Sequence, residues 1–436
     1  MNIIMSSKKS TCFEVVPIRR SRLKIIHKET IKPSSPTPHH LAKSKLSIFD
    51  QITPEIYLPL LLFYPSNNSD DEVDHHSLFS ERSHLLKTSL SEALSHFYVF
   101  AGEFEYNVSI SCNDHGLDLL NPKSALIPTA TESKQAEAGH LLLVQVNLFE
   151  CGGMTIGVSI SHKVADASTL STFIKSWAAI ALGSAGTTDH VLLPTEFDFF
   201  NSRQPTVEFA IENCVTKRFV LDASKIAALK SKATSDTVPN PTRVEAVSAL
   251  IWKSAMQASR SNLGYIKPSV WSQVVNMRTR SGLSLTETCW GILCESGNLL
   301  LKDHVETYSC SSWCRFPFYE ANFGWGKPSW VSIQGFKFKN TIMLMDMSDG
   351  LLNKSLSEAL THFYLFALEF VYNVSITCND DGAAFLEAQV NCPISKILDK
   401  PDVGLLEQLL PTDTGSTLSS EAGLQLYLAQ QVLVIM

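Results

Sequence analysis

The sequence lacks the features that would secrete it or place it in a membrane. It contains no run of about 18 uncharged apolar residues, and its first ten residues, MNIIMSSKKS, hold no long apolar stretch. The ten cysteines are scattered, without a CxxC pair or a Cys/His spacing suited to zinc. We therefore expect a cytoplasmic protein with free thiols, no bound metal and no membrane partner.

Strong net charge is also missing. The formal net charge is −7 over 436 residues, which gives no basis for expecting nucleic acid as a partner. Hydrophobic residues make up 44% and charged residues 18%, a balance typical of packed globular proteins and not of disordered ones. The chain is too long for one ordinary core, so we expect two domains, with room for an appendage.

Strand-like and helix-like segments alternate along the chain, which predicts a layered α/β architecture in both halves. An amphipathic helix is expected over residues 84–102, with Gly102 as its C-cap. Strands are expected over residues 107–112, 140–150 and 154–162.

The next helical segment is expected to begin at a cap on Asp166 or Ser168 and to end at Gly183. Residues 188–212 have no clean period and are expected to cross between the two halves. In the second half, strands and helices are expected over residues 219–233, 241–259 and 269–280.

The chain contains one internal repeat. Residues 85–116 recur at 351–382 with 24 identities in 32 aligned positions, at a constant offset of 266. A single recurrence is not a solenoid, which requires three or more stacked units. We interpret it as a fusion or rearrangement between neighbouring gene copies. In the copy Gly102 is matched by Leu368, so the helix stop signal is lost.

His162 is the first candidate for chemistry. It closes an alternating strand, and Asp166 opens a helix four residues later, so its side chain is expected at a rigid corner that can face a cleft. Neutral imidazole, with a pKa near 6.5, suits the removal of a hydroxyl proton. HxxxD alone is a weak motif, because a chain with thirteen His contains about half an instance by chance. A structural histidine beside a helix cap is the alternative.

A second motif, Phe323-Gly324-Trp325-Gly326, is rare in composition. Its glycines permit backbone turns that other residues resist, so the stretch is interpreted as a shaped loop. An aromatic plug on a core is the alternative interpretation, and it is compatible with an enzyme.

Together the two motifs resemble the BAHD family of plant acyl-CoA-dependent acyltransferases, whose marks are HxxxD in mid-chain and DFGWG nearer the C-terminus. The matching stretches here are HKVAD and NFGWG, with IKPSSPTPHHL, SIFDQ, LLLVQVNLF, VVNMRTR and SSWC beside them. The amino-acid sequence of these stretches is most similar to that of the acetyl-CoA-using alkaloid or terpenoid acyltransferases. The resemblance covers most of residues 12–350.

The resemblance implies an α/β fold of two domains like chloramphenicol acetyltransferase, each a mixed sheet with flanking helices, with a solvent channel between them. The predicted domains are residues 1–190 and 213–350, joined by a linker at 191–212. The second domain is predicted to be incomplete, and residues 351–436 to be a partial repeat of the first.

The resemblance also implies the reaction: transfer of an acyl group, with acetyl favoured, from acyl-CoA to an alcohol or amine of a plant specialised metabolite. No cofactor would be tightly bound, and the protein would be a monomer. His162 would deprotonate the acceptor, which attacks the thioester without an acyl-enzyme. Asp166 would pair with Arg278 and pin the corner. Ser311 and Trp313 match family positions near the acceptor and the oxyanion.

Three departures from the family pattern bear on activity. Asn322 stands where the family has Asp, so a hydrogen bond can be kept but an ion pair cannot. Only 46 positions separate Asn276 from Asn322, about half of what the resemblance implies. After Gly350 the copy of the first domain begins, and this copy keeps a stretch, FLEAQVNCPISKILDKPDVGLLEQLLP, that the first lacks after Gly116. A catalytically impaired or inactive rearranged paralogue, or an unsound gene model, is therefore the alternative to an active acyltransferase.

Overall fold

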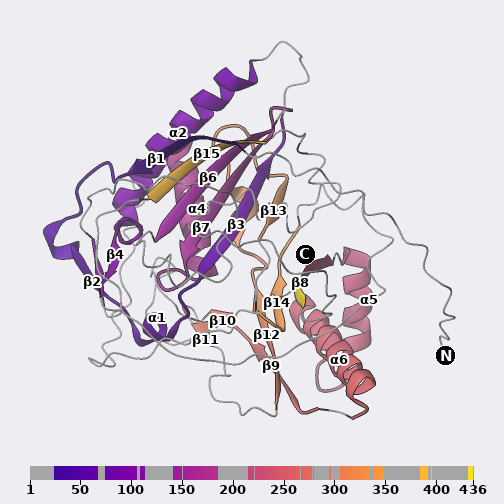
Figure 1. Cartoon of the computed structure of the whole chain (residues 1–436). Coiled ribbons are helices and arrows are strands. Elements are labelled where there is room, and N and C mark those ends of the chain that lie inside the picture. The colour runs from indigo at the N-terminus through magenta and orange to yellow at the C-terminus, as the bar shows by residue number, and fades with distance from the viewer. Residues whose placement is uncertain are drawn as a thin grey trace, which may run out of the picture.

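The computed structural model shows two large sheets with helices packed against them (Figure 1). It describes residues 24–66, 74–105, 109–112, 141–149, 151–184, 215–219, 221–265, 267–276, 278, 294–295, 305–333, 338–347, 383–390, 394 and 431–435. The predicted linker 191–212 and the repeated block 351–382 lie outside these residues.

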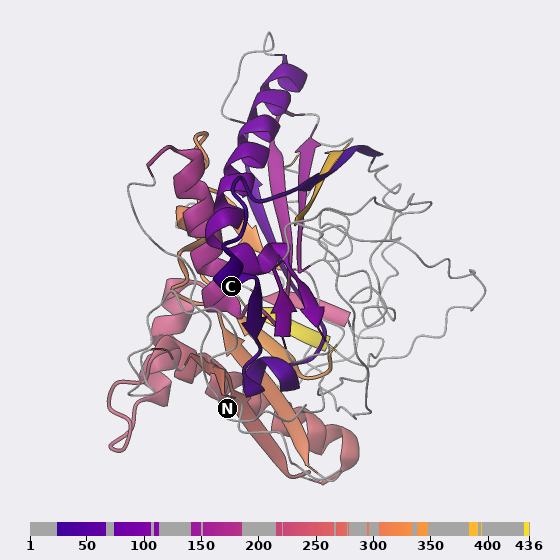
Figure 2. The same ribbon diagram turned by 90° about the vertical axis from the view of Figure 1, so that its left-hand side faces the viewer.

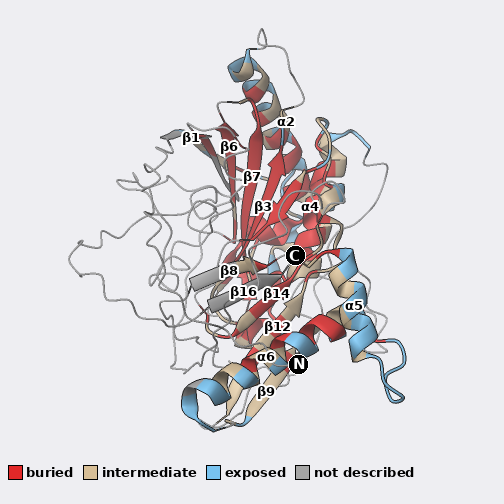
Figure 3. Cartoon of the chain, turned by 90° about the vertical axis from the view of Figure 1, so that its right-hand side faces the viewer, coloured by how far each residue is buried: buried red, intermediate tan, exposed pale blue. Residues whose placement is uncertain are grey.

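The first sheet has six strands in the order β1-β15-β6-β7-β3-β13. The strands are β1 (Lys24–Ile31), β3 (Tyr57–Tyr64), β6 (Leu142–Phe149), β7 (Met154–Ser161), β13 (Trp330–Ser332) and β15 (Ala383–Val390). β15 runs parallel to β6, and the other neighbours are antiparallel, so the sheet is mixed. The central strands β3, β6 and β7 are almost wholly buried (Figure 3).

Two helices, α2 (His75–His96) and α4 (Ala167–Ala181), lie side by side against the first sheet (Figure 2). Asp74 caps α2 and Asp166 caps α4, each accepting a backbone N–H of the first turn. Between the helices, the Trp177 indole donates to the Ser89 hydroxyl at 3.0 Å. The predicted helix after Asp166 is therefore confirmed, including the positive φ of Gly183 just past its end.

The predicted end of the first helix was wrong. α2 ends at His96, and a separate 3-10 turn, η2 (Tyr98–Ala101), precedes Gly102. All four side chains of η2 are buried, which one face of a continuing α-helix could not achieve. Gly102 has an ordinary negative φ. It is needed because a Cβ there would lie 2.6 Å from the Ser111 carbonyl oxygen.

The second sheet has five strands in the order β8-β16-β14-β12-β9. They are β8 (Val215–Phe219), β9 (Ser269–Gln273), β12 (Glu306–Ser312), β14 (Thr341–Leu344) and β16 (Gln431–Ile435). Every described pair in this sheet is parallel, whereas a mixed sheet was expected in each domain.

Helices α5 (Ala223–Ala233) and α6 (Arg243–Leu263) flank the second sheet (Figure 3). Val247, Ile251 and Ala255 of α6 pack on Tyr308 and Cys310 of β12, a spacing of four residues that presents one helix face. The predicted helix over residues 241–259 is confirmed and begins with a capping box on Thr242.

Smaller elements complete the described structure. They are η1 (His39–Leu41), α1 (Ile48–Ile52), η4 (Pro317–Glu320), a three-stranded sheet of β2 (Lys43–Lys45), β5 (Ser109–Ser111) and β4 (Glu103–Glu105), and the pair β10 (Val275–Asn276) and β11 (Cys294–Glu295). Among the described residues, no helix is both long and apolar enough to cross a membrane.

Candidate active site

His162 lies at the corner between β7 and α4. Its backbone N–H donates to the Ile56 carbonyl at 2.7 Å, and the N–H groups of Val164 and Ala165 both donate to the Ser161 carbonyl. These bonds close a tight turn directly after the strand. The corner is therefore held on both sides by backbone hydrogen bonds, which fixes the point where the imidazole leaves the main chain.

The imidazole is oriented by one further bond. Nδ1 of His162 lies 3.0 Å from the carbonyl oxygen of Ala165. A carbonyl only accepts, so Nδ1 carries the hydrogen, and Nε2 of the neutral ring carries the lone pair. The side chain is half-buried, and burial lowers the pKa of His162 below its usual value, against the smaller opposing effect of Asp166. The geometry thus favours a neutral ring whose Nε2 can accept a proton.

The carboxylate of Asp166 forms a buried ion pair. Nη1 of Arg278 donates to Oδ2 of Asp166 at 2.6 Å, and the two side chains are 1% and 6% exposed. Oδ1 of Asp166 accepts from the backbone N–H and the hydroxyl of Thr169, whose hydroxyl also accepts from Nη2 of Arg278. Burial by itself would raise the pKa of Asp166, but Arg278 and Thr169 outweigh it and hold the pKa below its usual value.

Arg278 is in turn positioned by the chain before it. Its Nη1 and its backbone N–H both donate to Oδ1 of Asn276, at 3.3 and 3.1 Å. The guanidinium therefore connects a residue of β10 to the N-terminus of α4. This connection joins the second half of the chain to the corner that carries His162.

Lys163 is a positioning residue that sequence reasoning missed. Its ammonium is fully buried and donates to the carbonyls of Gln51 at 3.0 Å and Asp50 at 3.4 Å, at the end of α1. A cation is favourable at a helix C-terminus, yet burial still lowers the pKa of Lys163 to about 8, against opposing effects of Glu55 and Asp50. The signal was the lysine directly after His162, together with the SIFDQ stretch of α1.

The loop of residues 322–326 packs against the first sheet and its helices. Phe323 is fully buried, stacks on Trp325 at 5.9 Å and meets the ring of Trp177 edge-on at 4.9 Å between centroids. Trp177 lies 11 residues beyond Asp166, which is about 16 Å along a helix that rises 1.5 Å per residue. The loop therefore packs well away from the His162 corner.

Comparisons with known proteins show what the whole chain is similar to. The model of the Transferase family matches residues 21–296, 281–351 and 347–424. The chain is 35% identical over 387 residues to akuammiline synthase 1 of Alstonia scholaris, covering 74% of this chain and 90% of that one. It is 34% identical over 409 residues to the BAHD acyltransferase BIA1 of Arabidopsis thaliana, covering 76% and 92%. The crystal structure of vinorine synthase superposes with a TM-score of 0.60 at 29% identity, covering 75% and 92%.

The chain belongs to the BAHD acyltransferase family. The expected two-domain α/β fold and the class of enzyme, an acyl-CoA-dependent O- or N-acyltransferase, are confirmed at the level of the family. The roles assigned to individual residues stay predictions.

In the loop that matches the family's DFGWG, Asn322 stands in place of Asp and holds the backbone turn. Oδ1 of Asn322 accepts the N–H groups of Gly324 and Gly326, both at 3.0 Å. The two glycines have φ angles of +113° and +104°, which other residues rarely adopt. Because both donors are backbone groups, the amide oxygen of Asn supplies the same acceptor that a carboxylate would.

The two remaining BAHD candidates lie in the second sheet and directly after one of its strands. Ser311 is in β12, where it pairs with Met343 of β14. Trp313 follows β12, is buried, and donates its backbone N–H to the Leu344 carbonyl at 2.7 Å. Within the described part of the chain, neither residue forms a hydrogen bond with His162. Their predicted roles at the acceptor and the oxyanion stay predictions.

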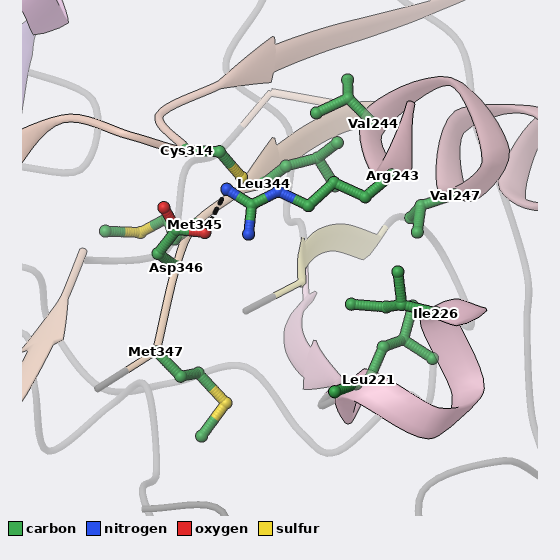
Figure 4. A pocket seen from close by; sticks show the side chains of 11 residues that line it. Leu221, Ile226, Arg243, Val244, Val247, Cys314, Leu344, Met345, Asp346 and Met347 are labelled. Carbon is green, nitrogen blue, oxygen red and sulfur yellow. Dashed lines mark ion pairs between the residues drawn. The ribbon is translucent and has the colours of Figure 1, made fainter. Parts of the chain in front are cut away.

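A cavity of about 150 Å³ lies between the N-terminal ends of α5 and α6 and the end of β14 (Figure 4). Its lining is mostly apolar, and one ion pair, Arg243 to Asp346 at 2.7 Å, crosses it. It contains none of the predicted site residues and is smaller than the roughly 300–1,000 Å³ typical of ligand pockets. We therefore assign it no substrate.

Proposed function

We propose that this BAHD protein transfers an acyl group, with acetyl favoured, from acyl-CoA to a hydroxyl or amine of a plant specialised metabolite, with His162 as the general base. The observation that carries the proposal is the bond from Nδ1 of His162 to the Ala165 carbonyl at 3.0 Å. It fixes the tautomer in which Nε2 accepts, and burial keeps the ring neutral.

The reaction follows from that protonation state. Nε2 takes the proton of the acceptor O–H or N–H while the oxygen or nitrogen attacks the thioester carbonyl. The C–S bond of the tetrahedral intermediate then breaks, and the CoA thiolate leaves with the proton that the imidazolium returns. No covalent acyl-enzyme forms. Holding both substrates at one corner supplies proximity and orientation.

The choice of acyl group rests on the relatives. Stemmadenine O-acetyltransferase of Catharanthus roseus is 32% identical over 393 residues, and its name gives acetyl as the group that it transfers. One relative of Strychnos nux-vomica, 31% identical over 398 residues, is named as an N-malonyltransferase. Acetyl-CoA is therefore the first donor to test, and malonyl-CoA is the second.

The proposed cellular compartment of the enzyme rests on the state of its cysteines. Four cysteines, Cys112, Cys151, Cys310 and Cys314, form no disulfide, as expected in a reducing cytosol. We place the enzyme there as a monomer without a tightly bound cofactor or a nucleic-acid partner.

The test is thiol release from acyl-CoA in the presence of a panel of alcohols and amines. His162→Ala is expected to lower kcat by 10²- to 10⁴-fold, the usual contribution of a general base. His84→Ala, which changes an exposed histidine on α2, is the matched control and is expected to keep full activity. Folded wild-type protein that releases no more thiol than His162→Ala would support an inactive paralogue instead.

A further inference from the structure

β15 comes from the C-terminal region, yet it lies inside the sheet built by the N-terminal part of the chain. Figure 1 shows this strand between β1 and β6. It is antiparallel to β1, with Thr30 opposite Ala384, and parallel to β6, with Val390 opposite Phe149. Both of its backbone edges are therefore paired by strands that precede His162 in the sequence.

The sequence encodes this strand once, and only after the second copy of the repeat. After Gly116 the first copy continues as LDLLNPKSAL, whereas after Gly382 the second copy continues as AAFLEAQV, which is β15. The repeated segment that directly precedes the strand is thus present twice, at 85–116 and at 351–382. The strand itself is present only at the far end of the chain.

Glu387 of β15 finds its ionic partner on the first copy of the repeat. Its carboxylate accepts from the Ser83 hydroxyl and lies 3.2 Å from the ammonium of Lys87, both on α2. The Glu387 side chain is only 11% exposed, so an unpaired carboxylate there would be costly. In the second copy Lys87 is matched by Asn353, which could not neutralise Glu387.

Gly102 gives a second reason why the copies are not interchangeable. A Cβ at Gly102 would meet the Ser111 carbonyl oxygen at 2.6 Å. The second copy has Leu368 at this position. It therefore cannot form the same close approach of β4 to β5 without moving the backbone.

The residues after β15 continue the contact with the first sheet. The backbone N–H of Ile394 donates to Sγ of Cys151, in the turn between β6 and β7. A Cβ at Gly153 in the same turn would lie 3.1 Å from the Ile394 side chain. The described contacts of this region with the first sheet thus reach from Thr30 in β1 to the turn that leads into β7.

We propose that β15, residues 383–390, is a complementing strand, with a further contact at Ile394. The C-terminal repeat supplies it, within the same chain, to the slot between β1 and β6 that the first copy leaves empty. The partner of that slot is therefore defined: it is the segment AAFLEAQV with its buried glutamate. Since β7, which leads into His162, pairs with β6, the C-terminal region supports the catalytic corner. This inference concerns assembly and holds whether or not the chain transfers acyl groups.

The test is a pair of engineered cysteines in the full-length protein. In Thr30→Cys/Ala384→Cys the two positions are directly opposite each other in the strand register, where Cβ atoms of an antiparallel pair lie about 4.5–5.5 Å apart. Oxidation is expected to join them within one chain, as mapped by mass spectrometry of the linked peptides. The matched control is Thr30→Cys/Phe385→Cys, in which a one-residue shift turns the second cysteine to the other face. It is expected to give at least tenfold less of the linked peptide.

Equal yields from the two double variants would overturn the proposal, and so would a bridge that joins two chains into a covalent dimer.

Amide exchange supplies a second measurement that needs no new cysteine. In Glu387→Gln the amides of β6 are expected to exchange at least tenfold faster, because the neutral amide cannot pair with Lys87. Glu320→Gln, which removes an exposed partner of Lys327, is expected to leave those amides unchanged. Unchanged exchange in Glu387→Gln would count against the buried anchor and against the proposal.

Discussion

At the scale of single residues, the buried ion pair of Asp166 and Arg278 carries the sharpest stability prediction. Asp166→Asn keeps the helix cap, since Asn caps about as well as Asp, but leaves the guanidinium buried without its anion. We expect a loss of about 3–5 kcal/mol in the free energy of unfolding, measured by denaturant titration. Asp222→Asn is the matched control. It changes an equivalent cap whose cation, Lys225, is partly exposed, and it should cost much less.

The pH dependence of this pair has a definite sign. The pKa of Asp166 is lower in the folded protein than in the unfolded chain. Its contribution is therefore fully present above the ordinary Asp pKa of about 3.9 and is lost as pH falls toward the folded value. Wild type and Asp166→Asn should thus converge in stability as pH falls below about 4. A difference that stays constant to pH 2 would contradict the assignment.

The role of His162 leads to a prediction for the pH dependence of kcat/KM. General-base catalysis needs the neutral ring, and burial lowers the pKa of His162. The acid limb of the kcat/KM profile should therefore fall at a pH below about 6.5, the value for an unperturbed histidine. The profile is measured at saturating acyl-CoA with variable acceptor. An acid limb above pH 7 would mean that a different group acts as the base.

At the scale of elements, the loop at residues 322–326 tests what Asn322 retains. Asn322→Ala removes the acceptor of two backbone N–H groups, and we expect it to cost about 1–3 kcal/mol. Asn322→Asp restores the family residue and keeps both acceptor bonds, so its stability should stay within about 1 kcal/mol of wild type. Denaturant titration of the two variants provides the measurement. A gain of more than about 2 kcal/mol from Asp would show that a cation lies unpaired beside the loop.

Local sequence predicted the elements around His162 well, because their signals are local. The alternating stretch before His162 and the cap on Asp166 depend on residues within one turn or one strand. The end of α2 could not be predicted in the same way. The need for Gly102 comes from the approach of Ser111, which follows it by nine positions and belongs to another strand.

At the scale of the whole molecule, the chain alternates between the two sheets. After β12 it returns to the first sheet as β13, then contributes β14 to the second, β15 to the first and β16 to the second. Because these consecutive strands belong to different sheets, the unfolding of one sheet is coupled to the unfolding of the other. We therefore expect one cooperative thermal transition, with equal calorimetric and van't Hoff enthalpies. Two resolved transitions would show that the sheets unfold as independent domains.

The predicted domain boundaries at 1–190 and 213–350 stay predictions. The alternation of consecutive strands between the two sheets affects where such boundaries can be placed. β15 and β16 both fall within residues 351–436, yet they join different sheets. We expect a division by sheet to describe folding units better than a division by sequence position.

The sequence by itself determined the strand–corner–helix around His162 and Asp166, through local periodicity and a helix cap. Its rare motifs indicated the family, and the resemblance to that family implied Arg278 as the partner of Asp166. Only the tertiary structure decided that Lys163 anchors α1, that the loop at residues 322–326 packs on Trp177, and that β15 completes the first sheet. The physical reason is that strand pairing uses backbone groups common to all residues. Where a strand docks is decided by distant partners such as Lys87 for Glu387.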